Sequence, residues 1–192
     1  MGAQQHGHME AVGYDMYLEM LSDAIKSTET GVVEEKKECL IDIAIDAHIP
    51  ESYIDSVKNR ISMYKRIATI ENEEDASDVI DEFIDRFGDI PSSVKGLVDV
   101  ALLRNRAAKA GIYEIKQRKD CIVVFVNDIK PIHITLMTKF LRRRAIIGAD
   151  KGKQYVTVRL LNKTPMETIN EVLKIFEFNS ENLPAPKQTL PQ

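Results

Sequence analysis

Residues 78–88 read Asp-Val-Ile-Asp-Glu-Phe-Ile-Asp-Arg-Phe-Gly, and this stretch decides the fold of the middle of the chain. Its apolar residues recur at the three- and four-residue spacing of one helix face: Val79, Ile80, Phe83, Ile84 and Phe87. Gly88 stands where helices commonly end in a left-handed residue. The acidic residues share the opposite, polar face: Asp78, Asp81, Glu82 and Asp85. The stretch predicts an amphipathic helix that ends at Phe87.

The neighbouring segments complete a helix-rich middle. Residues 51–67 suit a helix, and a polar stretch separates it from the helix that ends at Phe87. A further helix is predicted from Pro91 to a stop at Gly111. Residues 39–49 are rich in β-branched side chains and predict a strand. We expect the inward positions of the first helix to be Ile54, Val57, Ile61, Tyr64 and Ile67.

The last third of the chain alternates between strand and helix patterns. Strands are predicted over 113–116, 121–126, 145–148 and 154–161, with a helix over 128–144 between the two pairs. A capping box with proline at the first helical position begins a final helix at Thr164, which runs to about Phe178. The predicted fold class is α+β: a helical middle with flanking strands and a small β-rich C-terminal unit, preceded by an N-terminal helix over residues 10–26.

Composition is that of an ordinary folded protein. Hydrophobic residues make up 44% of the 192 residues and charged residues 29%, a globular rather than a disordered balance. No apolar run approaches the roughly 20 residues that a membrane helix needs. No signal peptide opens the chain, so we expect a cytoplasmic location and no membrane partner. Cys39 and Cys121 lie in apolar runs and are expected to be buried, reduced thiols.

The net charge of −4 is unevenly distributed. Residues 71–99 hold ten acidic and two basic side chains, whereas residues 101–174 hold sixteen basic and six acidic ones. Such asymmetry permits docking between charged surfaces. Solvated helix faces would give the same pattern, so charge alone leaves both interpretations open.

The residue patterns argue against a catalytic, cofactor-binding or metal site in this chain. Residues 148–154 have one residue too few between the glycines for a phosphate loop and lack its hydroxyl, so a turn between strands explains them better. His6 and His8 would supply only two metal ligands on a terminus. Neither cysteine has a nearby histidine that would mark a nucleophile.

Three stretches together resemble one known family. The first is GAQQHGH at residues 2–8 with AVGYDMY at 11–17, where His6 replaces a common serine. The second is AHIPESYI at 47–54, followed by Arg60 and by YKRIA at 64–68. The third is EFIDRFGDIP at 82–91. In this order and spacing they resemble the transcription-repair coupling factor family, also called Mfd, and the first resembles the end of the motif that closes its motor.

The resemblance implies a larger parent protein. Residues 1–30 would be the end of the translocase motor and the following helix, 31–182 the C-terminal regulatory (TRCF) domain, and 183–192 a tail without fixed structure. Such factors recognise stalled RNA polymerase, translocate on duplex DNA with ATP and Mg²⁺ in the motor, and recruit UvrA. Their C-terminal domain docks on a UvrB-like N-terminal module, which masks UvrA binding and restrains the motor. The chain itself would be non-catalytic and without a cofactor.

Two interaction sites follow as predictions. The resemblance implies that the docking contact is made by Glu82 and Asp85, with Asp81 and Asp89 as neighbours; a purely solvated face is the open alternative. The second is a nucleic-acid patch that would assist the motor: Arg142, Arg143, Arg144, Lys151 and Lys153. Cations at the end of a helix also stabilise the helix dipole, so a structural role for the arginines stays open.

Overall fold

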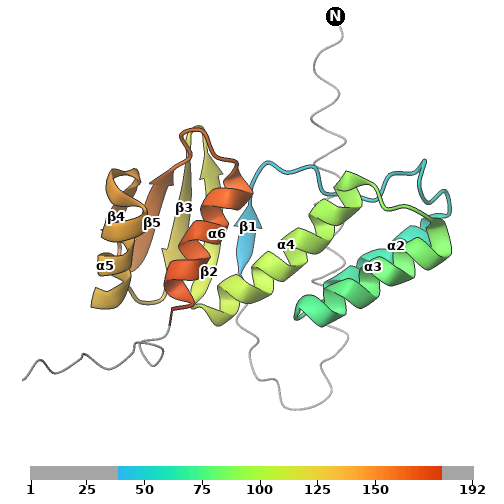
Figure 1. Ribbon diagram of the computed structural model, residues 1–192, viewed down its shortest axis with the longest axis horizontal. Helices are drawn as coiled ribbons and strands as arrows, with labels where there is room; N and C mark the ends of the chain where they lie inside the picture. The colour runs from blue at the N-terminus through green and yellow to red at the C-terminus, as the bar shows by residue number, and fades with distance from the viewer. Residues whose placement is uncertain (1–38, 179–192) are drawn as a thin grey trace, which may run out of the picture. The chain divides into compact units, whose positions relative to one another are not determined.

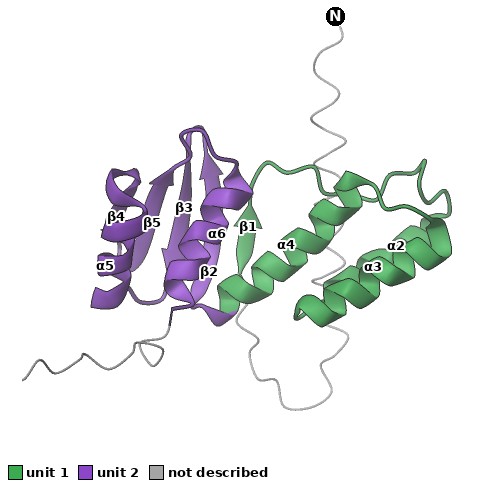
Figure 2. Ribbon diagram, viewed as in Figure 1, with its two compact units in different colours: residues 1–108 green, residues 109–192 purple. Residues whose placement is uncertain are grey.

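A computed structural model describes residues 39–178. The chain divides into two compact units, Met1–Ala108 and Lys109–Gln192 (Figures 1 and 2). Each unit is described by itself. The predicted N-terminal helix over 10–26, the predicted motor remnant over 1–30 and the predicted tail over 183–192 lie outside the described residues.

Unit 1 holds a short strand, β1 (Leu40–Asp42), and three helices, α2 (Val57–Ala68), α3 (Glu73–Phe87) and α4 (Ser92–Lys109), the last of which ends one residue beyond the unit. Local chemistry sets the helix ends. The Ser56 hydroxyl accepts a hydrogen bond from the backbone N–H of Asn59, and the Asn72 side chain accepts one from Asp75. Gly88 ends α3 with a φ of 83°, a backbone conformation that favours glycine.

The core of unit 1 forms where the apolar sides of the three helices meet the segment before them. Its largest fully buried side chains include Ile54, Met63, Ile67, Ile70, Phe83 and Leu97. The Tyr64 hydroxyl accepts a hydrogen bond from the backbone N–H of Ile49 at 2.9 Å, which fixes this segment to α2. Gly96 lets the backbone of α4 approach residue 46, because a Cβ there would lie 2.4 Å from the carbonyl oxygen of Asp46.

Unit 2 contains an antiparallel sheet with helices on one face (Figure 1). Its strands are β2 (Ile112–Arg118), β3 (Cys121–Val126), β4 (Ala145–Asp150) and β5 (Lys153–Arg159), in the spatial order β2-β3-β5-β4. Two α-helices, α5 (Pro131–Phe140) and α6 (Pro165–Phe176), and a 3₁₀ turn, η1 (Arg142–Arg144), complete the unit.

Alternation along the strands places the core of unit 2 between the sheet and the helices. Ile122 pairs with Val158 and Val124 with Val156, and all four are buried. The apolar side of α6 packs over β3 with buried Ile169, Val172, Leu173 and Phe176. On the other face, Tyr113, Phe125 and Tyr155 form a half-buried aromatic row with neighbouring ring centroids 6.1 and 5.7 Å apart.

The turn between β4 and β5 confirms the sequence interpretation of residues 148–154. Lys151 has a φ of 47° and Gly152 a φ of 80°, so both central residues of this two-residue hairpin are left-handed, as in a type I′ turn. Gly148 lies beneath the ring of Tyr155 on the neighbouring strand, where a Cβ would come within 2.4 Å. These glycines therefore serve the hairpin.

The α+β class and the order of most elements are confirmed, and three boundaries are wrong. The predicted strand over 39–49 is regular only at Leu40–Asp42, because beyond it Ala47 and Ile49 lie buried in the core of unit 1 without forming a ladder. The helix predicted from residue 51 begins at Val57, because the backbone turns at Pro50 and Ser56 supplies the N-cap. Val57 is 59% exposed, not inward.

The third boundary concerns the helix predicted over 128–144. It begins at Pro131 and ends at Phe140, since Arg142 takes a left-handed φ of 51° that stops the helix. None of the helices in residues 39–178 is both long enough and apolar enough to cross a membrane.

Candidate docking surface

The acidic face of α3 is held outward by its buried apolar face. Ala76, Val79 and Phe83 are buried in the core of unit 1. Phe83 contacts the rings of Tyr53 and Phe87, each with ring centroids 6.3 Å away. The helix therefore cannot rotate without exposing these rings, and its carboxylates keep a fixed direction.

Asp81 and Asp85, two of the four predicted docking residues, lie exposed on this face. Neither makes an ion pair within residues 39–178. Their spacing of four residues puts them one turn apart on the same side of α3. Two unpaired carboxylates in this arrangement can accept bidentate hydrogen bonds from arginine side chains of a partner.

Glu82 occupies a different setting, because it bridges α2 and α3. One carboxylate oxygen accepts from Arg66 Nε at 3.2 Å and the other from Arg86 Nη1 at 2.6 Å. The side chain is 32% exposed, so the carboxylate remains reachable from solvent. Glu82 as a docking residue stays a prediction, and any partner cation would share this carboxylate with two local arginines.

Asp89 follows the end of α3 and lies near Tyr53. The Tyr53 hydroxyl donates to the carbonyl oxygen of Gly88 at 2.9 Å, which holds the turn after the helix. Burial, and secondarily the negative charge of Asp89, raise the pKa of Tyr53. Asp89 is exposed and extends the acidic face beyond the helix end.

Ile84, which the helical spacing assigns to the apolar face of α3, is largely exposed instead. It is 47% exposed on α3, one residue from Asp85. Its position at the edge of the apolar stripe was the available signal, since edge positions can face either way. Single exposed apolar side chains are common on protein surfaces, so Ile84 adds apolar area to this face but does not by itself define a binding surface. We define the α3 docking face as Asp81, Ile84, Asp85 and Asp89, with Glu82 at its border.

The predicted basic patch is divided in the structure. Arg142, Arg143 and Arg144 form η1 just before β4, whereas Lys151 and Lys153 stand at the hairpin after β4. Six strand residues separate these groups, which corresponds to about 20 Å of extended chain. The five residues therefore form two cationic groups at opposite ends of one strand.

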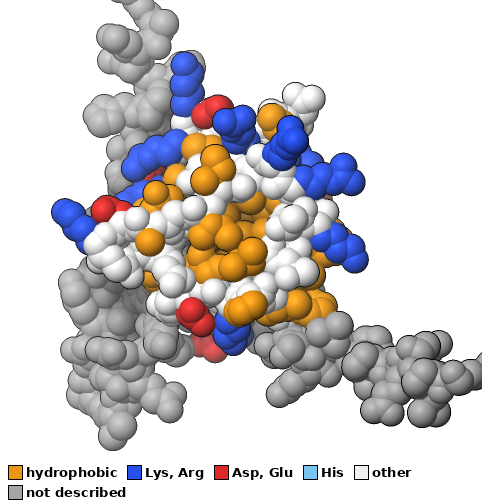
Figure 3. Space-filling view, turned by 90° about the vertical axis from the view of Figure 1, so that its left-hand side faces the viewer, with side chains coloured by type: hydrophobic (Ala, Val, Ile, Leu, Met, Phe, Trp, Pro, Cys, Tyr) orange, Lys and Arg blue, Asp and Glu red, His pale blue; other side chains and the backbone are white. Residues whose placement is uncertain are grey.

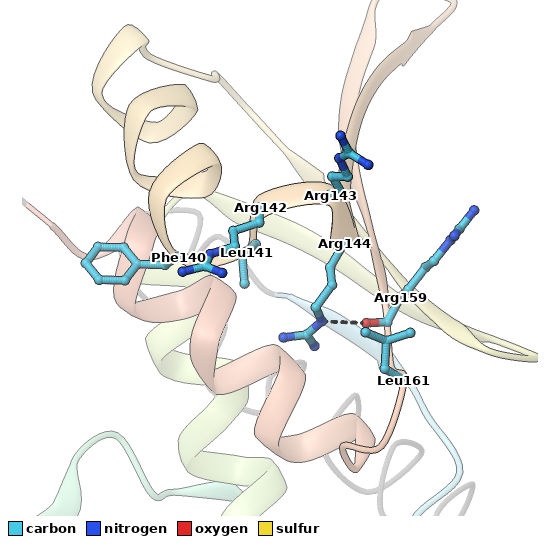
Figure 4. Close-up of a pocket in the computed structure, with 7 residues that line it drawn as sticks. All are labelled: Phe140, Leu141, Arg142, Arg143, Arg144, Arg159 and Leu161. Atoms are coloured by element: carbon cyan, nitrogen blue, oxygen red, sulfur yellow. Dashed lines mark hydrogen bonds between the residues drawn. The ribbon is translucent and has the colours of Figure 1, made fainter.

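A shallow pocket lies beside η1 (Figure 4). Its volume is about 580 Å³, and it is lined by Phe140, Leu141, Arg142, Arg143, Arg144, Arg159 and Leu161. Arg144 has a structural role, since it pairs with Glu171 of α6 at 2.8 Å and donates to the carbonyl oxygen of Arg159 at 3.1 Å. Arg142 and Arg143 are exposed and keep their charges available.

Histidine, cysteine and carboxylate side chains are the usual metal ligands and nucleophiles of enzymes. Within residues 39–178 no three His, Cys, Asp or Glu side chains come together as metal ligands. Burial and the neighbouring Asp120 raise the pKa of the Cys121 thiol, which is the opposite of what a nucleophilic cysteine requires. The fold is that of an α+β domain, and the exposed carboxylates of α3 form its candidate docking surface.

Comparison with known proteins places the chain in a family. Residues 43–136 match the family model of the TRCF domain. The chain is 32% identical over 179 residues to the transcription-repair-coupling factor of Bacillus subtilis (strain 168), covering 90% of this chain and 15% of that protein. It is 34% identical over 185 residues to that of Staphylococcus aureus (strain USA300), covering 92% and 16%. The Escherichia coli (strain K12) protein is 28% identical over 189 residues, covering 94% and 16%.

The fold agrees with these matches. A crystal structure of the C-terminal domain of transcription-repair coupling factor superposes with a TM-score of 0.63 at 22% identity, covering 73% of this chain and 92% of that one. The chain belongs to the TRCF domain family, and its fold is that of the C-terminal domain of a transcription-repair coupling factor. Such a domain is not itself a motor domain. The chain spans about 15% of the length of the curated relatives.

Proposed function

We propose that this chain is the regulatory domain of a transcription-repair coupling factor and that the α3 docking face holds the parent protein in a restrained state. The face docks on the UvrB-like N-terminal module of the same protein. While docked it masks UvrA binding and restrains the DNA translocase, which uses ATP and Mg²⁺ in the motor. Engagement of stalled RNA polymerase on duplex DNA releases the contact.

The observation that carries the proposal is the state of the carboxylates on α3. Asp81 and Asp85 are exposed and without ion pairs in the described part of the chain, and Ile84 between them is 47% exposed. In such an interface Ile84 would add apolar area. The buried Phe83 ring behind the face packs against Tyr53 and Phe87 and limits movement of the helix, which would lower the entropy lost on docking.

The test is made in the full-length protein, because tethering supplies much of the effective concentration of an intramolecular contact. The pair Asp81→Lys and Asp85→Lys reverses the docking charges. The pair Asp120→Lys and Asp128→Lys is the matched control, since it makes the same charge change at exposed positions of unit 2. We expect the first pair to raise ATP turnover in the absence of polymerase and the control pair to leave it unchanged. Equal turnover in all three proteins would refute the proposal.

The second candidate function is the nucleic-acid module that assists the motor. The exposed Arg142 and Arg143 beside the pocket favour it. It predicts DNA binding that weakens steeply with salt and that falls in the variant Arg142→Ala, Arg143→Ala. The separation of the two cationic groups, and the apolar side chains between them, fit this function less well than a contiguous basic stripe would.

A further inference from the structure

β4 is an open edge of the sheet in unit 2. It pairs with β5 through six consecutive residue pairs without a bulge, and it ends the strand order β2-β3-β5-β4. Within residues 39–178 no strand pairs with its outer side. Each residue of a strand points its backbone N–H and C=O to one side or the other, so an outer row of donors and acceptors faces away from β5.

The sequence of β4 lacks the devices by which proteins normally protect such an edge. Ala-Ile-Ile-Gly-Ala-Asp contains no lysine and no proline, and its pairing has no bulge. Ile146 is 55% exposed and Ile147 is 43% exposed. Their register partners are Thr157 and the buried Val156, so one isoleucine extends each face of the sheet. A strand added here would therefore bury an isoleucine on both of its sides.

The side of unit 2 that carries α5 and β4 gathers apolar side chains in its middle with lysines and arginines around them (Figure 3). The exposed apolar residues of these two elements are Ile134, Phe140, Ile146 and Ile147. The charged groups stand at the two ends of β4, with Arg142 and Arg143 before it and Lys151 and Lys153 after it. The two charged groups are therefore separated by the length of one short strand.

Backbone strain marks the same surface. Arg142 and Leu161, which both line the pocket at the start of β4, have left-handed φ values of 51° and 53°. Leu161 is also 68% exposed. Non-glycine residues held in this conformation concentrate at binding surfaces, where the contact they present can compensate for the strain.

We propose that β4 receives an extended protein segment as an additional strand, and that this segment has an apolar centre with acidic residues at both ends. The centre would lie against Ile146 and Ile147, and the carboxylates would meet the arginines at one end and the lysines at the other. Main-chain hydrogen bonds supply the affinity of such strand addition, and the side chains supply the specificity. This site is independent of the α3 docking face.

Charge and polarity argue against two other occupants of the β4 edge, a second copy of this chain and a nucleic acid. A second copy pairing antiparallel along β4 would place Arg142 and Arg143 of one copy beside Lys151 and Lys153 of the other, with like charges meeting at both ends. Nucleic acid would leave the exposed isoleucines without an apolar partner, because protein–DNA interfaces are polar and strongly charged.

The test uses the full 192-residue chain labelled with ¹⁵N and three synthetic peptides. The first has a Val-Thr-Val-Ile centre flanked by two glutamates on each side, the second has lysines in place of the glutamates, and the third is the first with alternate backbone nitrogens methylated. We expect the first peptide to bind about ten-fold tighter than either control, which corresponds to about 1.4 kcal/mol. Amide signals of residues 145–150 should shift and gain protection from hydrogen exchange.

Two variants test whether the first peptide binds at β4. Ile146→Lys should weaken the first peptide about ten-fold, whereas Val57→Lys, which puts the same charge at an exposed position of unit 1, should not change binding. Equal binding of the three peptides, or unshifted amides at 145–150, would overturn the proposal. Three other results would also overturn it. One is a dimer of the chain that Ile146→Lys dissociates, and another is that duplex DNA, and not the peptide, shifts the amide signals of β4. The third is protection of β4 from hydrogen exchange that is lost when residues 179–192 are deleted.

Discussion

Glu82 has a structural role in the packing of α2 against α3, apart from its predicted docking role. It joins Arg66 on α2 to Arg86 on its own helix, so its removal should loosen the packing of α2 against α3. We expect Glu82→Gln to lower the free energy of unfolding by about 1 kcal/mol, the upper end for partly exposed ion pairs. Urea denaturation measures this change. Asp81→Asn is the matched control and should change it by less than about 0.5 kcal/mol; equal effects of the two variants would contradict the bridging role.

His133 predicts a pH dependence at the residue scale. Burial, and then the charge of Lys130, lower the pKa of His133, and its Nδ1 accepts a hydrogen bond from the backbone N–H of Lys130 at 3.2 Å. Because the unfolded state binds the proton more readily, the stability from the neutral ring is complete above the ordinary pKa of about 6.5. That stability is lost as the pH falls through the lowered value.

The measurement is the urea midpoint of the chain between pH 7.5 and pH 5. It should fall in this range for the native chain and fall less for His133→Gln. Glutamine at the third position of a helix keeps an acceptor for the Lys130 N–H but does not titrate. Identical pH profiles for the two proteins would contradict the assignment of a buried neutral ring.

At the scale of elements, the contact between α4 and the segment before α2 depends on the absence of a side chain at Gly96. Alanine favours helices by about 1 kcal/mol over glycine, yet a Cβ here would lie 2.4 Å from the Asp46 carbonyl oxygen. We expect Gly96→Ala to destabilise the chain by about 1–3 kcal/mol, the range for overpacking. Thermal unfolding followed by circular dichroism measures it; an unchanged or raised midpoint would show that the helix can move away without cost.

In the hairpin between β4 and β5, we expect one substitution to stabilise the chain and another to destabilise it. Lys151 is left-handed in a type I′ turn, a position that asparagine tolerates better. Lys151→Asn should raise the free energy of unfolding by about 0.5 kcal/mol, and Gly152→Ala should lower it by about 1 kcal/mol through backbone strain alone, since nothing lies within 4 Å of the added Cβ. Urea titration of both variants decides the point, and a loss in Lys151→Asn would contradict the turn assignment.

The elements that the sequence predicted well are those whose ends carry their own chemical signals. Gly88 after α3 and the Thr164 capping box before α6 mark helix ends without reference to any other part of the chain. The strand predicted over 39–49 failed beyond Asp42 because Ala47 and Ile49 are buried in the core of unit 1 among helix side chains and form no ladder. The inward position predicted for Val57 is wrong because Ser56 caps the helix and leaves residue 57 exposed.

The candidate site was predictable only in part, for a related reason. The acidic side of α3 follows from periodicity, and Asp81 and Asp85 are indeed exposed there. The pairing of Glu82 with Arg66 joins residues sixteen apart in the sequence, and no local pattern indicates it. The division of the basic residues, in contrast, follows from the strand predicted over 145–148, because Arg144 precedes that strand and Lys151 follows it.

On the scale of the whole molecule, the two units carry exposed surfaces of opposite charge. Unit 1 presents carboxylates around an exposed isoleucine on α3, and unit 2 presents cations around exposed isoleucines on β4. Each surface fits a protein partner of complementary charge. The chain belongs to the TRCF domain family, and we propose that its α3 docking face lets it restrain the motor of a parent protein.

The affinity of the parent protein for UvrA, measured by calorimetry, tests the central proposal most directly. The full-length protein carrying Asp81→Lys and Asp85→Lys should bind UvrA at least about ten-fold tighter than the unaltered protein, because the undocked N-terminal module no longer hides its surface. The control with Asp120→Lys and Asp128→Lys should bind as the unaltered protein does. If all three proteins bind UvrA with the same affinity, the acidic face of α3 is not the contact that masks it.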